Sequence, residues 1–274
     1  MNDYRPGGFS ILPLIVKNLL IINGLFFVAT IVFQNSLQID LKDYLALYYP
    51  SSENFRPYQL ITHLFMHGNF MHLFSNMFAL WMFGAVIENY YGPQKFLTYY
   101  IVTGLGAALL HTFVNYIEIS QLQNAANVFL SNPTPGTFES FVLNEVPSVY
   151  RSSFSELMSL WTNNPDSIAF KDNAISIVNE LIRVKENIPT VGASGAVFGV
   201  LLAFGMIAPN AMIYIFFFLP MKAKYFVILY GLFELYNGLQ NNPGDNVAHF
   251  AHLGGMLFGF LLIKYWRRKE NRWR

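Results

Sequence analysis

A serine and a histidine, each set among glycines in an uncharged stretch, are the residues of this chain best suited to chemistry. Ser194 lies in residues 187–221 and His252 in residues 246–263, and neither stretch carries a charged side chain. A hydroxyl and an imidazole held on neighbouring helices form a nucleophile–base pair. Because polar side chains inside a bilayer are costly and are generally kept for function, this pair predicts a catalytic site within a membrane.

The composition favours a membrane location. Hydrophobic residues make up 54% of the chain and charged residues 12%, whereas a soluble domain carries about 25% charged residues. The charges cluster and leave apolar runs at residues 18–34, 64–87, 96–117, 187–221, 225–240 and 246–263, the fifth interrupted by Glu234. A helix needs about 17–25 apolar residues to span a bilayer. The sequence therefore predicts an all-α membrane protein with six transmembrane helices.

The same composition excludes several partners and chemistries. A formal net charge of +1 leaves no dominant basic surface, so we expect no nucleic-acid partner. The chain has no cysteine, which excludes disulfides and thiol catalysis. His63 and His67 have a metal-binding spacing, but they lack the glutamate that follows the first histidine in zinc proteases. We therefore expect neither a metal nor another cofactor.

Basic residues predict the orientation of the helices. Lys95, Lys222 and Lys224 lie between spans, and residues 264–274 form a basic tail. All of them fall on one side of a six-span bundle, which the positive-inside rule makes the cytoplasmic side, together with both termini. We see no signal-peptide cleavage pattern and no arginine-rich transit peptide, which favours a bacterial plasma or inner membrane.

Two segments outside the spans are expected on the far side of the membrane. The first is an outer loop at residues 35–62. The second, residues 118–186, holds eight acidic and four basic residues. It also contains two amphipathic helical patterns, and Asp166 is placed to cap the second helix. We expect it to be an extracytoplasmic helical insertion between spans three and four, either a stabilising cap or an element that handles substrate. The sequence therefore predicts one membrane domain in three parts: spans one to three in residues 1–117, the insertion in 118–186, and spans four to six with the basic tail in 187–274.

Two polar residues on the second expected span also suggest chemistry. His72 and Asn76 are four positions apart, so they lie on one helix face, one turn apart. Two hydrogen-bond donors aimed at one point form a site that stabilises an anion. The alternative is that both residues simply join helices, because histidine and asparagine often do so in membranes.

Each member of the Ser194–His252 pair also has a purely structural reading. Serine among small residues usually permits close helix packing. Here, however, neighbouring glycines give each helix a face without side chains, along which another helix can come within reach of the hydroxyl. These glycines are Gly192, Gly195 and Gly199 around the serine, and Gly255 and Gly259 after the histidine. His249, one turn before His252, is the alternative base.

Together these motifs resemble the rhomboid family of intramembrane serine proteases. The matching pieces, in the family's order, are His72-x-x-x-Asn76, Glu88 with Gly92, Gly192-x-Ser194-Gly195, and Ala251-His252-Leu253-Gly254-Gly255 with Gly259. The similarity covers residues 50–117 and 187–265. The long insertion at 118–186 departs from the family pattern, in which many members have a short loop there.

The resemblance implies a role for each matched residue. Ser194 is expected to be the nucleophile and His252 the general base, as a dyad with no carboxylate to orient the histidine. The groups expected to hold the oxyanion are the Ser194 backbone N–H, His72 and Asn76, with Gly192 lending that site flexibility. Phe198, one turn after Ser194, is expected to stack on the ring of His252. The glycines Gly195, Gly199, Gly255 and Gly259 are expected to support the site.

The resemblance also implies a substrate class: single-span membrane proteins, cleaved near the outer face of the lipid bilayer. The span that carries Glu234, Tyr236 and Asn237, with the loop 241–244, is expected to act as a mobile gate. The alternative is a non-catalytic rhomboid-like protein that binds and guides membrane clients. Loss of the serine or the histidine would favour it, and this chain has both. A channel or transporter would need paired ionisable residues at mid-membrane in two related halves, which we do not see.

Overall fold

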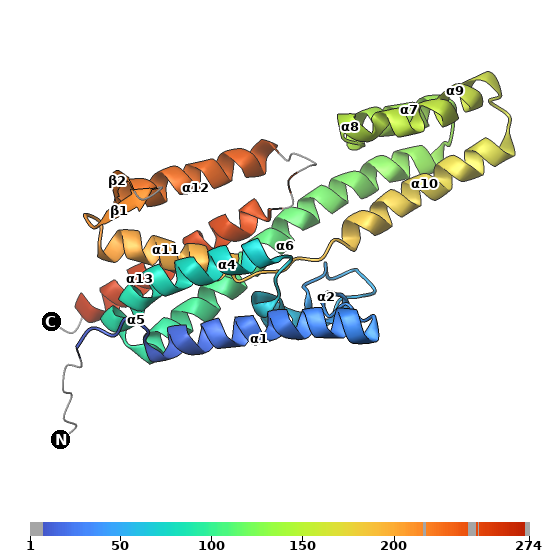
Figure 1. The fold of residues 1–274 in the computed structure, drawn as a ribbon. Coiled ribbons are helices and arrows are strands. Elements are labelled where there is room, and N and C mark those ends of the chain that lie inside the picture. Colours follow the sequence, from blue (N-terminus) through green and yellow to red (C-terminus); the bar gives the residue numbers. More distant parts are fainter. Residues whose placement is uncertain (1–7, 216–217, 241–244, 246, 272–274) are drawn as a thin grey trace. The chain divides into compact units, whose positions relative to one another are not determined.

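The computed structural model describes residues 8–215, 218–240, 245 and 247–271, and most of them are helical (Figure 1). The loop 241–244 of the expected gate, and Arg272 and Arg274 of the basic tail, lie outside the described residues. The chain forms two compact units. The first consists of Met1–Leu47, Arg56–Thr112 and Pro189–Arg274, and the second of Tyr48–Phe55 and Phe113–Ile188.

The longest apolar helices begin in the first unit. Helix α1 covers Leu14–Leu37, a second helical segment runs over Phe70–Tyr91, and α6 covers Pro93–Ser131. These three are long and apolar enough to cross a membrane, and the apolar helix α11, Ser194–Ile207, is shorter. The protein is thus mostly helical with several apolar helices, as predicted, while the count of six spans stays a prediction.

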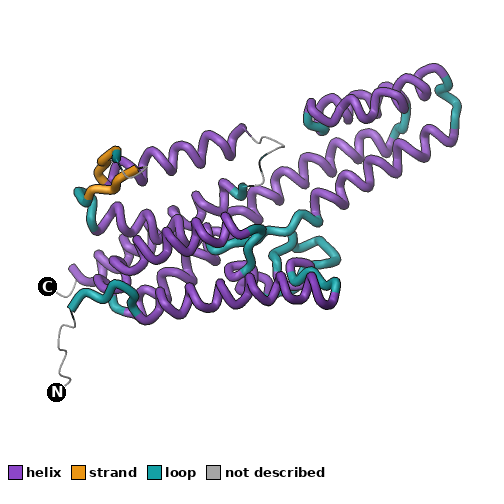
Figure 2. The backbone as a smooth tube through the Cα atoms, in the orientation of Figure 1, coloured by secondary structure: helices purple, strands orange, loops and turns teal. Residues whose placement is uncertain are grey.

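Other helical elements belong to the first unit, and Figure 2 shows how helices alternate with loops along the chain. They are α2 Lys42–Leu45, α3 Gln59–Thr62, η1 His63–Phe65, α12 Ala223–Gln240 and α13 His249–Asn271. The segment Phe70–Tyr91 consists of α4 Phe70–Ala79, a π-helical turn η2 Leu80–Gly84 and α5 Ala85–Tyr91.

The carboxylate of Glu88 on α5 caps the N-terminus of α1. Its two oxygens accept hydrogen bonds from the N–H groups of Ile15 at 2.9 Å and Val16 at 2.8 Å. The first N–H groups of a helix have no partner within the helix, and negative charge is favourable beside them. Glu88, one of the residues that suggested the family, therefore joins α5 to α1.

A pair of short strands makes the all-α prediction wrong in one segment. The uncharged stretch 187–221 is predicted to be one span, but α11 ends at Ile207. Strands β1 Met212–Ile215 and β2 Leu219–Lys222 follow and pair antiparallel. Pro209 disfavours the helical conformation in the residue before it, and β-branched and aromatic residues favour strands.

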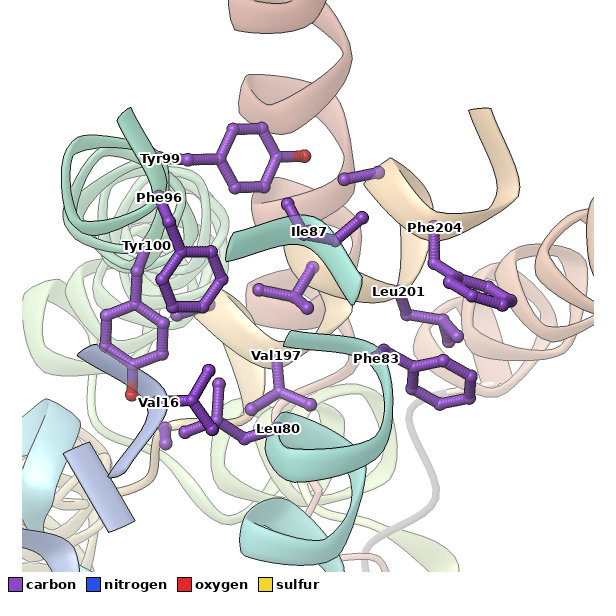
Figure 3. Close-up of a cluster of buried hydrophobic side chains, with 14 of the residues drawn as sticks. Val16, Leu80, Phe83, Ile87, Phe96, Tyr99, Tyr100, Val197, Leu201 and Phe204 are labelled. Carbon is purple, nitrogen blue, oxygen red and sulfur yellow. The ribbon is translucent and has the colours of Figure 1, made fainter. Parts of the chain in front are cut away.

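A cluster of buried apolar side chains joins the helices of the first unit (Figure 3). Its members include Val16 of α1, Leu80 and Phe83 of η2, Phe96 and Tyr100 of α6, and Val197 and Leu201 of α11. Since protein interiors are close-packed, the helices that share this cluster hold one another in fixed positions. The cluster thereby positions the first turns of α11, where Ser194 lies.

The second unit has a hydrophobic core of its own. Its elements after α6 are α7 Pro135–Glu145, α8 Ser148–Arg151, η3 Ser152–Phe154, α9 Ser155–Asn163 and α10 Ile168–Glu186. Phe138 of α7 and Trp161 of α9 are buried and pack with ring centroids 6.0 Å apart. This segment therefore folds around buried aromatic side chains and is not an irregular loop.

Two predictions about this region are wrong in detail. The third span is predicted to end near Ile117, but α6 continues without a break to Ser131, because neither proline nor glycine interrupts that stretch. Asp166 is predicted to cap the last helix of the insertion. The cap is instead Ser167, whose hydroxyl accepts a hydrogen bond from the N–H of Phe170, and α10 starts at Ile168.

Candidate active site

Ser194 is the first residue of α11, and the loop before it contains a backbone conformation, at Gly192, that favours glycine. Gly192 has φ of +126°, a backbone conformation that side chains rarely adopt. Its N–H donates a hydrogen bond to the carbonyl of His63 at 2.9 Å. The turn at Gly192 therefore delivers Ser194 to the start of the helix, where backbone N–H groups lack partners within the helix and favour negative charge.

His63, which the sequence suggested only as a weak metal ligand, supports this loop. The His63 ring is neutral near pH 7, because burial lowers the pKa of His63 to about 4. In the neutral ring Nδ1–H donates to the carbonyl of Gln59 at 2.7 Å. His63 is thus a structural residue, and its backbone carbonyl fixes Gly192.

The structure brings Ser194 and His252 together. The Oγ atom of Ser194 lies 2.9 Å from Nε2 of His252, although the two residues are 58 positions apart. The contact depends on a close approach of α11 and α13, because a Cβ atom at Gly255 would overlap the carbonyl oxygen of Gly195. Gly255 therefore allows α13 to approach α11, while the missing side chain of Gly195 mainly makes room for Ala107 of α6.

The other two glycines of the expected seam pack differently. A Cβ atom at Gly259 would overlap the hydroxyl of Tyr99 on α6, and one at Gly199 would lie 2.6 Å from Cβ of Thr103, also on α6. Tyr99 donates a hydrogen bond to the Gly199 carbonyl at 2.7 Å. Gly199 and Gly259 thus make room for α6, whereas Gly255 makes room for the backbone of Gly195 on α11.

A carboxylate lies at hydrogen-bond distance from His252, contrary to the expectation that no carboxylate orients this histidine. Oε2 of Glu234 on α12 lies 2.8 Å from Nδ1 of His252 and 2.7 Å from Nδ1 of His249. Glu234 is 3% exposed. The sequence offered a signal for this contact, because a lone carboxylate in an apolar helix requires buried hydrogen-bond donors.

His249 continues this chain of contacts away from the serine. Its Nε2 atom lies 2.9 Å from Oδ2 of Asp245. This hydrogen bond lowers the pKa of the Asp245 carboxyl. His249, the alternative base in the sequence reading, faces two carboxylates and is not the histidine bonded to Ser194.

Phe198 lies against one face of the His252 ring. Its ring and that of His252 have centroids 4.0 Å apart and planes 6° from parallel. The ring of Tyr230 on α12 packs next to Phe198, with centroids 4.9 Å apart. The imidazole of His252 is therefore fixed by a stack on its face and by hydrogen-bond partners at both nitrogens.

His72 and Asn76, the expected oxyanion donors, lie on α4. The space left by the missing side chain of Gly192 lies between the His72 ring and the serine: a Cβ atom there would be 2.9 Å from His72 Nε2 and 3.6 Å from Ser194 Oγ. Asn76 is 6% exposed, and its Nδ2 atom has no hydrogen-bond partner among the described residues. Buried donors are rarely left unpaired, so the lack of a partner for this amide calls for an explanation.

Three side chains of the site are also of metal-binding types. Ligand atoms of Glu234, His249 and His252 all lie within 4.8 Å of one another. The two Glu234–histidine distances, however, are those of hydrogen bonds. The group is therefore satisfied by direct hydrogen bonding among its own members.

Comparison with known proteins gives one family. The family model described as Rhomboid domain matches residues 54–119 and 153–269, so the match includes Ser194, Glu234 and His252 and leaves out residues 120–152.

Several individual relatives carry rhomboid names. An uncharacterized mitochondrial rhomboid protein of Schizosaccharomyces pombe is 27% identical over 230 residues, which is 78% of this chain and 53% of that protein. RHOMBOID-like protein 12, mitochondrial, of Arabidopsis thaliana is 24% identical over 229 residues, 82% of this chain and 51% of that protein. Rhomboid protease AarA of Providencia stuartii is 42% identical over 57 residues, 21% of this chain and 20% of that protein. The chain spans about half the length of the first two relatives.

Proposed function

This chain belongs to the rhomboid family, and we propose that it is an intramembrane serine endopeptidase that hydrolyses peptide bonds in or near the transmembrane segments of other membrane proteins. The observation that carries the proposal is the 2.9 Å contact between Ser194 Oγ and His252 Nε2. A nucleophile and a base within hydrogen-bond reach are the arrangement that acyl transfer requires.

The proposed reaction follows from the positions of the two side chains. Ser194 Oγ attacks the carbonyl carbon of the scissile bond while His252 Nε2 takes the hydroxyl proton. The tetrahedral intermediate collapses, the C–N bond breaks, and the proton passes from His252 to the leaving amine. Water then attacks the acyl-enzyme and loses a proton to His252. As the second tetrahedral intermediate collapses, His252 returns this proton to Ser194 Oγ, and the carboxylic acid product is released from the regenerated enzyme.

The oxyanion is proposed to lie beside Gly192. Its donors are the Ser194 backbone N–H at the start of α11, the His72 ring and the unpaired Nδ2 of Asn76. Donors fixed in advance around a developing negative charge supply a large share of the rate enhancement in acyl transfer. An oxygen at the position of the missing Gly192 Cβ atom would lie 2.9 Å from His72 Nε2, which is a hydrogen-bond distance.

The proposed substrates are single-span membrane proteins whose helix unwinds near the outer face, because a hydrogen-bonded helix hides its carbonyl groups from a nucleophile. The protein is a multi-pass membrane protein, with both termini proposed on the cytoplasmic side. Relatives matched over most of the chain are named as mitochondrial, whereas the bacterial plasma membrane expected from the sequence has support only from the short match to the Providencia protein.

The experiment that tests the proposal is cleavage of a model single-span substrate in liposomes, with wild type beside Ser194→Ala. The expected result is product from wild type only. Product from both proteins assigns the activity to another nucleophile or a contaminant. No product from either, over several substrates, favours the client-binding alternative, in which Ser194 and His252 are structural.

A further inference from the structure

We infer that Glu234 is a positioning residue that holds His252 in the form able to take the serine proton, so that the site works as a Ser194–His252–Glu234 triad. The inference rests on the proposed function of the Ser194–His252 pair. It gives α12 a part in the chemistry through His252, and the gating role that the sequence suggested for this helix stays a prediction.

The first step of the argument concerns the burial of the carboxylate. Glu234 is the only charged side chain between Tyr225 and Gln240, and it is 3% exposed. A buried carboxylate is stable only with good hydrogen-bond donors. Among the described residues, the donors to this carboxylate are Nδ1 of His252 and Nδ1 of His249, both on α13 and both bonded to Oε2.

The second step fixes the proton on His252. An ionised carboxylate accepts hydrogen bonds and cannot donate them. The 2.8 Å contact with Glu234 therefore places the ring proton of neutral His252 on Nδ1. Nε2 then carries the lone pair, and Nε2 is the atom that lies 2.9 Å from Ser194 Oγ. The other tautomer would present an N–H to the serine and could not accept its proton.

The third step concerns charge. When His252 takes the proton of Ser194, the ring becomes an imidazolium with an N–H at each nitrogen. The Glu234 oxygen at Nδ1 stabilises this positive charge, because a charge-assisted hydrogen bond is stronger than a neutral one. In serine proteases the buried acid of the triad acts in the same two ways, by selecting the tautomer and stabilising the imidazolium.

His249 and Asp245 hold the carboxylate in place. Nδ1 of His249 donates to the same Oε2 atom, and Nε2 of His249 lies 2.9 Å from Asp245, whose Oδ1 accepts the N–H of Val247. The loop before α13 is thus connected through His249 to Glu234. Two donors on one oxygen leave the carboxylate little freedom to turn away from His252.

The test is a comparison of Glu234→Gln with a matched control. An amide in place of the carboxylate can present its NH₂ group to Nδ1 of His252 and so favour the wrong tautomer. We expect kcat to fall on the order of 10²–10⁴-fold, with KM unchanged. Glu234→Asp restores a carboxylate and should recover part of kcat. The control is Glu88→Gln, a buried carboxylate bonded only to backbone N–H groups of α1 in the described contacts; it should lower Tm and leave kcat unchanged.

The tautomer can also be measured without an activity assay. In wild-type protein labelled with ¹⁵N-histidine, the signals of His252 are those lost in His252→Gln. We expect them to show Nδ1 protonated and Nε2 unprotonated in the neutral ring, and to change to the opposite tautomer in Glu234→Gln. An Nε2–H tautomer in the wild type would overturn the inference, whether or not any variant folds poorly.

Failure of the inference and failure of the proposed function give different results. If wild type cleaves substrate, Ser194→Ala does not, and Glu234→Gln retains the wild-type kcat, the inference is wrong and the protease assignment stands. If wild type cleaves nothing, the protease assignment is wrong, and the tautomer measurement still decides whether Glu234 sets the proton position on His252.

Discussion

The rings of Phe198 and His252 lie parallel, 6° apart in plane, with 4.0 Å between their centroids. Phe198 follows Ser194 by one turn of α11, so the helix that carries the serine also covers one face of the histidine. The ring edges contact Ser194 on one side and Glu234 on the other. Three helices, α11, α12 and α13, therefore restrict one imidazole, which is what an efficient general base requires.

Asn76 gives a prediction in which stability and activity separate. Its Nδ2 atom is buried without a partner among the described residues, and an unpaired buried donor destabilises a protein by about 1–3 kcal/mol. Asn76→Ala should therefore leave Tm unchanged or higher, while kcat falls about 10²–10³-fold through loss of an oxyanion donor. Thermal unfolding and cleavage rates are measured on the same preparation.

The matched control for Asn76 is Ser75→Ala. Ser75 is exposed on the same helix, and its hydroxyl is bonded to the carbonyl of Met71. This variant should keep both kcat and Tm. An Asn76→Ala protein with wild-type kcat would remove Asn76 from the oxyanion site.

Gly192 gives a second prediction. In Gly192→Ala the new Cβ atom would lie 2.9 Å from the His72 ring, at a backbone φ of +126°. Such strain costs about 1–3 kcal/mol, and the methyl group fills the space assigned to the oxyanion. We expect lower Tm and loss of most cleavage activity. Gly24→Ala, on α1 with open space around the glycine, should leave cleavage unchanged and Tm unchanged or higher, because alanine favours the helix more than glycine does. An active Gly192→Ala protein would move the oxyanion elsewhere.

Chelation tests the reading of the Glu234, His249 and His252 cluster as hydrogen-bonded. Because each histidine lies at hydrogen-bond distance from Glu234, we expect prolonged treatment with EDTA to leave the cleavage rate unchanged. Loss of activity on chelation, restored by added Zn²⁺, would contradict this reading and make the cluster a metal site. The cleavage rate of the same protein in the same buffer without EDTA serves as the baseline.

The absence of cysteine in the chain makes the predicted orientation directly measurable. Gln94 precedes the apolar part of α6 and Ser153 lies in the second unit, and both are exposed. In sealed cells, a membrane-impermeant maleimide should label Ser153→Cys at once and Gln94→Cys only after permeabilisation. Equal labelling of both, or the reverse order, would contradict cytoplasmic termini and an outer insertion.

The sequence predicted the central pair of the site because its signals are local. Gly192, Ser194 and Gly195 fall within one turn of chain, and His252 and Gly255 lie one turn apart on another helix. Small residues at these spacings permit close helix contact. The structure places a backbone-to-backbone contact between Gly195 and Gly255 at that point.

The parts that sequence reasoning missed depend on contacts between distant segments or on local competition. The partnership of Glu234 with His252 joins two helices across 18 positions, and no spacing rule reveals it. The end of α11 at Ile207 was masked by an uncharged stretch that continues into β1 and β2. Hydropathy measures apolar length and does not distinguish a helix from a following apolar strand pair.

The measurement that tests the central claim most directly is the site of reaction with a fluorophosphonate, mapped by mass spectrometry of the full-length protein in liposomes. The account predicts one adduct on Ser194 in wild type, none at that peptide in Ser194→Ala, and a strongly reduced rate in His252→Ala, since the histidine activates the serine. An adduct on another residue of the wild type, or labelling of Ser194 that proceeds equally fast without His252, would contradict the account.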